Sequence, residues 1–210
     1  MNAKNDLMQN NPLENSQLID SSLAGLTRAS IGLSIVALGL SGFVYSSVAT
    51  GLGQAIFPHQ ANGSLIVQND QVVGSSLVAQ PFVQAQYFQP RPSASNYDPM
   101  AMTGSNLART NPALHQVVDE RLNRISAQEQ IEKSAIPADL VTASGSGIDP
   151  DIGLQSALIQ VKRVAQARQI SEQDVLKQVQ HHTVQPTLGV LGVERVNVLA
   201  LNLALDRMVQ

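Results

Sequence analysis

A long stretch without formal charge near the N-terminus constrains this sequence more than any other feature. Arg28 is followed by no Lys, Arg, Asp or Glu until Asp70, and residues 29–50 read ASIGLSIVALGLSGFVYSSVAT. A helix rises about 1.5 Å per residue, so this segment would extend about 33 Å, enough for a hydrocarbon core of about 30 Å. The sequence therefore predicts a leader at 1–28, a transmembrane helix at 29–50 and a single soluble domain at 51–210.

A cleaved signal peptide is the alternative reading of the same stretch. Ser47-Val48-Ala49 has the small residues of a cleavage site after an apolar core. The polar leader contains three acidic residues, unlike a basic n-region, and the uncharged run exceeds the usual apolar core of about 7–15 residues. These two properties favour an uncleaved anchor.

Few charges indicate the orientation of this helix. Arg28 lies on the leader side, and the first Lys or Arg beyond the helix is Arg91. The positive-inside rule then predicts a cytoplasmic N-terminus and a domain outside the cytoplasm.

Composition excludes several classes of protein. The net charge is −3 and aromatic residues make up 3% of the chain, so neither a basic surface nor a stacking platform for nucleic acid is expected. The chain has no cysteine, which excludes disulfides, thiolate metal sites and a cysteine nucleophile.

Short strands are expected at the start of the domain. Asn62-Gly63, a turn signal, precedes a short apolar run at 64–67, and Asn69-Asp70 and Gly74 separate it from further runs at 72–73 and 77–79. This pattern predicts small antiparallel strands. The following segment, 89–99, contains prolines that exclude a helix or a central strand, so a loop is expected as far as about residue 110.

Helices are expected in the second half. Asn111-Pro112 predicts a helix start and an amphipathic helix to about residue 132. Asp149-Pro150 predicts a second start, and Ser171 with Asp174 predicts a third through a capping box. A strand from about residue 196 is expected to pass into a terminal helix at 201–208. The predicted fold is α+β, with short strands and about three to four helices after the membrane helix.

No arrangement of residues predicts a catalytic centre or a metal site. The loop Ser144, Gly145, Ser146, Gly147, ahead of the expected second helix, is a weak candidate for anion or cofactor binding, but it lacks the spacing and the lysine of a P-loop. His181 and His182 are adjacent, so on a helix they point in different directions and are poor metal ligands.

Two features suit contact with other proteins. Gly32, Gly39 and Gly42 leave a face of the membrane helix without bulk, which permits close packing against a neighbouring helix, although glycine is also simply common in membrane helices. Arg91 follows a proline in a stiff loop and could present its charge to a partner. An ordinary surface charge is an equally good reading of Arg91.

A series of long sequence blocks, in order from the membrane helix to the C-terminus, resembles one known family. These blocks resemble the KdpC subunit family of the Kdp potassium-importing P-type ATPase, and they read FPHQANGSLI (57–66), VGSSLVAQPF (73–82), YFQPRPSASNY (87–97), GSNLARTNP (104–112), PADLVTASGSGIDP (137–150), QVKRVAQAR (160–168) and RVNVLALNLALD (195–206). The resemblance covers most of the chain, although the leader is longer than is usual in the family and Gln89-Pro90 fall in a variable part of their block.

The resemblance implies a non-catalytic accessory subunit of a high-affinity, ATP-driven potassium uptake pump in the bacterial inner membrane, with a periplasmic domain. Its partners would be a channel-like potassium-binding subunit, an ATP-hydrolysing P-type subunit and a small helical subunit, with the lipid bilayer around the helix. The family role would be assembly and stabilisation of the complex, or raising the ATP affinity of the hydrolysing subunit, so ATP and potassium are relevant to the complex rather than expected as cofactors of this chain. Phe57, Gln60, Asn62 and Arg91 then become candidates for the partner interface.

Two other classes of protein stay open on the residues alone. An anchored or secreted periplasmic ligand-binding protein would also have one N-terminal apolar helix and a soluble domain. An anchored hydrolase is disfavoured, because the chain lacks the clustered His, Glu and Ser that such an enzyme needs.

Overall fold

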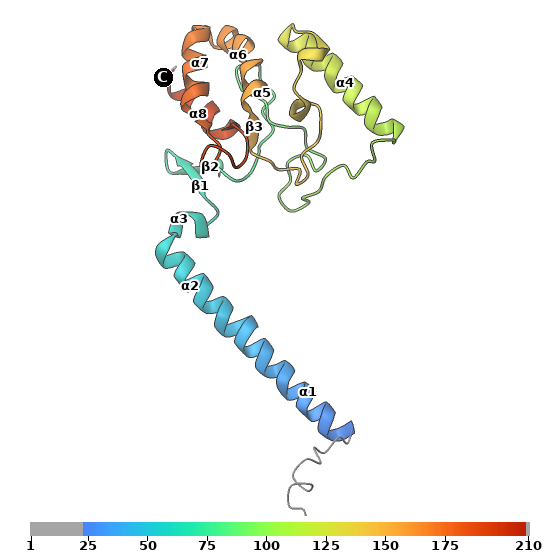
Figure 1. The fold of residues 1–210 in the computed structure, drawn as a ribbon. Coiled ribbons are helices and arrows are strands. Elements are labelled where there is room, and N and C mark those ends of the chain that lie inside the picture. The colour runs from blue at the N-terminus through green and yellow to red at the C-terminus, as the bar shows by residue number, and fades with distance from the viewer. Residues whose placement is uncertain (1–22, 209–210) are drawn as a thin grey trace, which may run out of the picture. The chain divides into compact units, whose positions relative to one another are not determined.

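A computed structural model describes residues 23–208, and Figure 1 shows their fold. The chain divides into two compact units, one ending at Ala61 and one beginning at Asn62. Most of the predicted leader, residues 1–22, lies outside the described residues.

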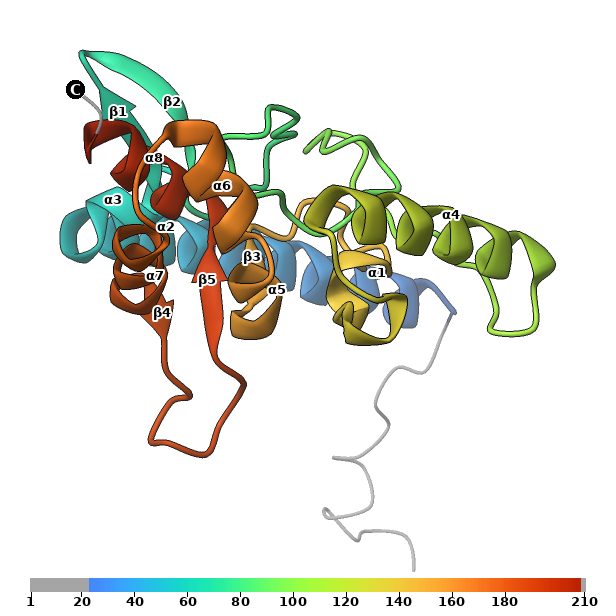
Figure 2. The same ribbon diagram turned by 90° about the horizontal axis from the view of Figure 1, so that it is seen from above.

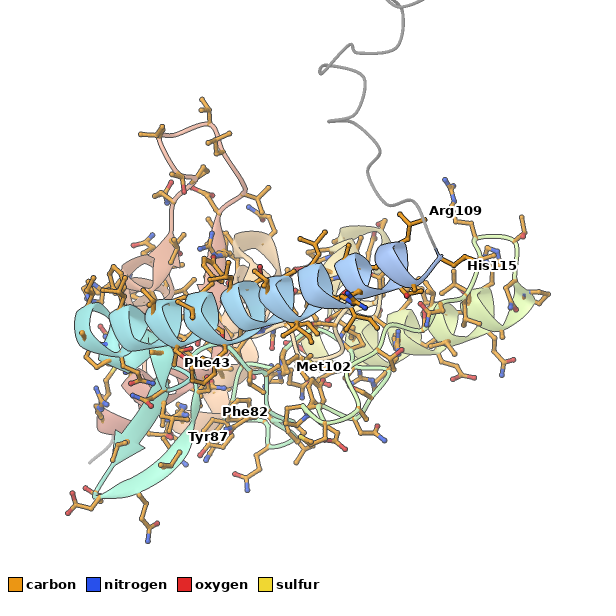
Figure 3. The ribbon with its side chains drawn as sticks, turned by 90° about the horizontal axis from the view of Figure 1, so that it is seen from below. Phe43, Phe82, Tyr87, Met102, Arg109 and His115 are labelled. Atoms are coloured by element: carbon orange, nitrogen blue, oxygen red, sulfur yellow. The ribbon has the colours of Figure 1, made fainter. Side chains whose placement is uncertain are left out.

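The first unit is one long helix followed by a short one. Helix α1 (Leu23–Ala37), a π-helical segment (Leu38–Tyr45) and α2 (Ser46–Ile56) run on without a break for 34 residues. The predicted segment 29–50 lies wholly inside this helix, which is long and apolar enough to cross a membrane, with a mean hydropathy of 1.8. The apolar side chains stand exposed along it, Phe43 among them at 73% exposure (Figure 3).

The long helix ends where a proline follows. Phe57 leaves the helical conformation at φ −131°, while its N–H still donates to the Gly53 carbonyl at 2.8 Å. Pro58 disfavours the helical conformation in the residue before it, and it then begins the short helix α3 (Pro58–Ala61).

The second unit opens with an antiparallel hairpin. Strand β1 (Leu65–Gln68) pairs with β2 (Gln71–Ser75) through a turn at Asn69-Asp70, where φ is +51° and +61°. Two positive φ values match the right-handed twist of a hairpin, and Asn and Asp tolerate them. The prediction of a third strand at 77–79 is wrong. This segment forms a turn and coil, and the Ala79 N–H donates instead to the Ile148 carbonyl at 2.9 Å.

The chain between β2 and helix α4 (Pro112–Glu129) contains no helix or strand, as the prolines predict. The start of α4 confirms the prediction from sequence, because the Asn111 side chain accepts the Ala113 N–H at 2.9 Å and Pro112 fills the first helical position. The helix ends three residues before the expected boundary, since Gln130 adopts a left-handed conformation at φ +57°.

The predicted helix start at Asp149-Pro150 is wrong. A strand, β3 (Asp151–Gly153), comes first, and the helical residues that follow form two pieces, α5 (Leu154–Leu158) and α6 (Val161–Arg168). Pairing with β5 (Arg195–Asn197), distant in sequence, holds β3 extended. Asp149 caps a turn instead of a helix, because its Oδ1 accepts the Asp151 N–H at 3.1 Å.

The C-terminal elements follow the predicted order. Ser171 caps helix α7 (Glu172–His181) by accepting the Asp174 N–H at 3.1 Å, and its hydroxyl also donates to the Asp174 carboxylate at 2.7 Å. Strand β4 (Thr183–Val184) and β5 complete a three-stranded antiparallel sheet with the order β3-β5-β4. Helix α8 (Val198–Met208) begins directly after β5, three residues before the expected boundary.

One hydrophobic core unites the second unit. Helices α5 to α8 pack around the three-stranded sheet, and α4 lies on the other side of the domain (Figure 1). Side chains that are fully or almost fully buried come from the long loop, the sheet and the C-terminal helices: Phe88, Ile152, Val164, Val175, Val179, Val196, Leu201 and Leu205. The fold is α+β, as predicted, with one long apolar helix in front of it.

Candidate functional site

The three glycines of the membrane helix all face open space. A Cβ built on Gly32, Gly39 or Gly42 would meet no atom within 4 Å. Gly39 and Gly42 lie in the π-helical segment, so they do not keep the α-helical register with Gly32. The Ser46 hydroxyl donates to the Gly42 carbonyl in the same region. Short π-helical segments occur frequently at functional sites, and this one combines small side chains with a widened turn.

The other candidates for a partner interface divide between the two units. Phe57 and Gln60 are exposed in the first unit, at the end of the long helix and in α3. Asn62 is exposed at the start of the second unit, before the hairpin. Arg91 lies in the long loop of that unit, and its side chain is 26% exposed.

Arg91 is an anchor of the long loop rather than a free surface charge. Its Nη1 donates to Asp149 Oδ2 at 2.9 Å, and its carbonyl accepts the Tyr97 hydroxyl at 3.0 Å. The first contact joins the loop before α4 to the turn before β3, and the second holds the loop to itself. Either reading of Arg91 from the sequence, as partner contact or as solvated charge, misses this internal role.

The serine hydroxyls of the Gly/Ser loop accept hydrogen bonds from N–H groups of the neighbouring backbone. Ser144 Oγ accepts the Gly147 N–H at 2.9 Å, and Ser146 Oγ accepts the Ile148 N–H at 3.2 Å. Gly147 has φ +76°, and a Cβ there would lie 2.7 Å from the Thr103 carbonyl, so only glycine fits. A strand follows this loop, so the expected helix N-terminus that would favour an anion is absent from this position.

A network of polar side chains that sequence reasoning missed fixes the part of the long loop just before Arg91. Arg163 on α6 donates from Nε to Glu129 at 2.8 Å, from Nη1 to the Tyr87 carbonyl at 3.0 Å and from Nη2 to Gln160 at 2.8 Å. Gln160 Oε1 also accepts the Gln89 N–H at 2.8 Å. The ion pair is almost fully buried, with side-chain exposures of 9% for Arg163 and 3% for Glu129.

A second arginine of α6 extends this network. Arg168 Nε donates to the Gln86 carbonyl at 2.7 Å, and Nη2 donates to Asp206 on α8 at 2.8 Å. Its guanidinium carbon lies 5.2 Å from the centre of the Tyr87 ring. Tyr87 in turn lies beside Phe82, with ring centres 5.3 Å apart (Figure 3). Two arginines of one helix therefore hold a loop that has no regular backbone pairing.

Burial changes the titration of a tyrosine within this loop. Burial raises the pKa of the Tyr97 hydroxyl, and the positive charges of Arg121 and Arg124 act in the opposite direction. Burial also lowers the pKa of Arg121, whose Nη1 donates to the Val141 carbonyl at 2.8 Å. Both groups donate hydrogen bonds in this part of the domain, Tyr97 to the Arg91 carbonyl and Arg121 to the Val141 carbonyl.

The histidine pair is engaged at the end of α7. The two rings lie edge to face with centres 5.2 Å apart, and His182 Nδ1 lies 2.9 Å from the Gln178 carbonyl. Among residues 23–208, no three His, Cys, Asp or Glu side chains are arranged to hold a metal ion.

Two pockets open on the surface of the second unit. One, of about 310 Å³, is lined by residues of the long loop and α4, including Phe82, Tyr97, Arg124 and Glu129. The other, of about 620 Å³, lies at β3 and the start of β5, beside the Arg91–Asp149 and Arg195–Asp151 ion pairs.

The comparison with protein families identifies the chain. The family described as KdpC, K+-transporting ATPase, c chain, matches residues 27–207, from the long helix to the last turn of α8. The chain belongs to the KdpC family.

Relatives of known name agree with this assignment. A potassium-transporting ATPase KdpC subunit of Xanthomonas campestris is 52% identical over 184 residues, which is 87% of this chain and 88% of the relative. The KdpC subunit of Shewanella putrefaciens is 49% identical over 86% of this chain and 88% of the relative. The KdpC subunit of Sorangium cellulosum is 48% identical over 85% of this chain and 96% of the relative. The family resemblance of the sequence blocks is therefore confirmed. The alternative of a periplasmic ligand-binding protein is not favoured.

Proposed function

We propose that this KdpC chain is a non-catalytic accessory subunit of an ATP-driven potassium uptake pump, and that it serves assembly and stabilisation of the complex. The observation that supports this most directly is the family match across residues 27–207. The relatives are named as subunits of a potassium-transporting ATPase, and a subunit acts together with other chains. The partners are a channel-like potassium-binding subunit, an ATP-hydrolysing P-type subunit and a small helical subunit.

The long helix is the membrane part of this proposal. It crosses the bacterial inner membrane once, with the N-terminus in the cytoplasm and the domain in the periplasm, as the single positive charge of Arg28 favours. Its apolar side chains are exposed in the isolated chain, so lipid and the membrane helices of partner subunits both have access to them. The glycines and the widened π-helical turn permit close approach of one such partner helix.

The alternative family role, raising the ATP affinity of the hydrolysing subunit, has less support from the described residues. In the candidate loop Ser144–Gly147, the two serine hydroxyls accept hydrogen bonds from the Gly147 and Ile148 N–H groups, and the loop contains no basic residue. A domain in the periplasm would also be separated from cytoplasmic ATP by the bilayer. Assembly is therefore the role that we favour.

Purification of the whole pump tests the proposal. All subunits are produced together, this chain has a C-terminal tag, and membranes are extracted in mild detergent. The expected result is that channel-like and P-type subunits purify with the tag and that the preparation shows potassium-stimulated ATPase activity. Purification of this chain alone would contradict the proposal.

A second measurement separates the two family roles. The ATPase rate is measured against ATP concentration for the complex with this subunit and for membranes from cells that lack its gene. A role in assembly predicts a loss of intact complex with an unchanged KM for ATP in whatever complex remains. A raised KM with full assembly would instead support the role in ATP affinity.

A further inference from the structure

The connection between β4 and β5 is an apolar loop that projects from the domain (Figure 2). The sequence has no formally charged residue between His182 and Glu194. Four of its apolar side chains are strongly exposed: Leu188 at 87%, Val190 at 78%, Leu191 at 62% and Val193 at 72%. Contiguous apolar side chains on a protein surface mark a site of contact with another molecule.

This loop has a fixed conformation. Thr187 and Leu191 exchange two backbone hydrogen bonds, of 2.9 and 3.0 Å, and the Gly189 N–H donates to the Pro186 carbonyl at 2.9 Å. A turn held in this way loses less backbone entropy on binding than an open loop would.

Leu188 is an unfavourable residue for its position, if the only role of this turn is to reverse the direction of the chain. Leu188 has φ +56°, where a bulky side chain is strained, and the adjacent Gly189 has φ +75°. Asn or Gly would hold the same conformation at lower cost and would not expose an apolar side chain. Backbone strain of this kind occurs at sites of function. The strain and the exposure of Leu188 therefore point to the same use, which is contact with a partner.

The pocket of about 620 Å³ continues this apolar surface at the foot of the loop. Val193, Glu194 and Arg195 line the pocket, and they lead from the loop into β5, which begins at Arg195. Two half-exposed ion pairs line the pocket, Arg91–Asp149 and Arg195–Asp151, each with an N–O distance of 2.9 Å. We name the loop residues 185–193 and this pocket together the hairpin surface.

The charges of the hairpin surface select the kind of partner. Its pocket contains four carboxylates, Asp139, Asp149, Asp151 and Glu194, against the two guanidinium groups of Arg91 and Arg195. This excess of negative charge repels the phosphate groups of lipids. Lipid acyl chains, in turn, offer no hydrogen bonds to the charged side chains of the pocket wall. The loop also contains no Trp, Tyr, Lys or Arg, which anchor proteins at a bilayer surface. A polypeptide with apolar side chains next to a lysine or arginine matches both parts of the surface.

We propose that the hairpin surface is the docking site for another subunit of the pump, and that the docked segment places apolar side chains on Leu188, Val190 and Leu191 and a basic side chain beside Glu194. This inference rests on the proposed function, because it needs a partner subunit. It goes further by assigning the contact to one loop and one pocket and by stating the chemistry of the partner.

Site-specific photo-crosslinking in the whole pump tests this inference. The photoreactive residue benzoylphenylalanine replaces Leu191 in one variant and Val83 in a control, since Val83 is 84% exposed in a different loop. The expected result is a cross-link from position 191 to one pump subunit, at a segment that contains Lys or Arg among apolar residues. The control at position 83 should give clearly less of this product, because Val83 lies in a different loop, away from the hairpin surface.

Charge reversal supplies the second measurement. Glu194→Lys should lower the yield of the cross-link from position 191 severalfold, while Glu172→Lys, at an exposed acid on α7, should leave it unchanged. Equal cross-links from positions 191 and 83, products with lipid alone, or products with a second copy of this chain would overturn the inference. If the pump subunits purify with the tagged chain in such a case, the proposed function stands and only the docking site is wrong.

Discussion

Asn202 on α8 and Phe88 in the long loop are joined by two hydrogen bonds across 114 residues of sequence. The Phe88 N–H donates to Asn202 Oδ1 at 2.8 Å, and Asn202 Nδ2 donates to the Phe88 carbonyl at 3.0 Å. Both residues are buried, with exposures of 1% and 0%. One amide side chain thus replaces the strand partner that the Phe88 backbone lacks, and the Phe88 ring reaches the core as a result.

Replacement of this amide should destabilise the domain. Asn202→Leu keeps a similar volume but leaves the Phe88 N–H and carbonyl buried and unpaired, which costs about 2–4 kcal/mol of unfolding free energy. The measurement is urea unfolding of the full chain in detergent, followed by circular dichroism. The matched control Asn123→Leu, at an exposed position of α4, should change stability by less than about 0.5 kcal/mol. Equal effects of the two substitutions would contradict this role for Asn202.

Arg163 should be irreplaceable by an apolar residue. Arg163→Met removes the buried partner of Glu129 and the donor to the Tyr87 carbonyl, and an uncompensated buried charge costs about 3–5 kcal/mol. Protease sensitivity of the segment near Tyr87 should rise at the same time, because the loop loses its anchor. The neighbouring exposed residue provides a control, since Lys162→Met should change neither stability nor cleavage.

A double substitution tests whether the buried charge is the cause. Glu129→Gln combined with Arg163→Met removes both charges, so it should recover part of the stability that Arg163→Met loses. No recovery would assign the effect to the loop contacts of Arg163 instead.

Tyr97 should ionise above the usual pKa of about 10, because burial of its hydroxyl disfavours the charged form. In the unfolded chain the same group ionises at its ordinary pKa. The stability linked to Tyr97 is therefore fully present below about pH 10 and is lost as the pH rises through the raised pKa. Ultraviolet titration of tyrosinate should show a late phase among the three tyrosines, and Tyr97→Phe should remove that phase.

The arginines beside Tyr97 give the control for this titration. Their positive charges lower the pKa of the hydroxyl against the effect of burial, so Arg124→Gln should move the late phase to still higher pH. A shift to lower pH would contradict the assignment.

Bulk on the glycine positions of the membrane helix should loosen assembly. Gly39→Leu or Gly42→Leu fills the open space that permits close approach of a partner helix, so less of the channel-like and P-type subunits should purify with the tagged chain. Ala37→Leu is the matched control, because it adds bulk to the same helix at a position that is not glycine, directly before the π-helical segment. Unchanged recovery of the other subunits with both glycine variants would refute this prediction.

The sequence predicted correctly those helix starts and turns that depend on interactions between residues close together in the chain. The Asn111 and Ser171 caps, the proline at position 112 and the Asn69-Asp70 turn each act within three or four residues, and each has the predicted place in the structure. The uncharged stretch after Arg28 likewise predicted the long helix, since length and apolarity alone define such a segment.

The errors come from contacts between distant parts of the chain. Asp149-Pro150 has the composition of a helix start, but pairing of Asp151 with Asn197 on β5 makes the next residues a strand. Arg91 was open between two readings because its partner, Asp149, is 58 residues away. Asn202 stands in the apolar run NVLALNLALD on the buried face of α8, and a polar residue at such a position is a local sign of its buried pairing with Phe88, which sequence reasoning missed.

The long loop depends on contacts with α6 and α8, so it cannot complete its packing until these later helices have been synthesised. Phe88 emerges from the ribosome 114 residues before Asn202, which at about 5–20 residues per second is about 6–23 s. Until α6 has been made, this part of the long loop lacks its contacts with Arg163 and Arg168, and until α8 has been made the Phe88 backbone lacks Asn202. A chain that ends before Asn202 therefore cannot form the two hydrogen bonds that pair the buried Phe88 backbone.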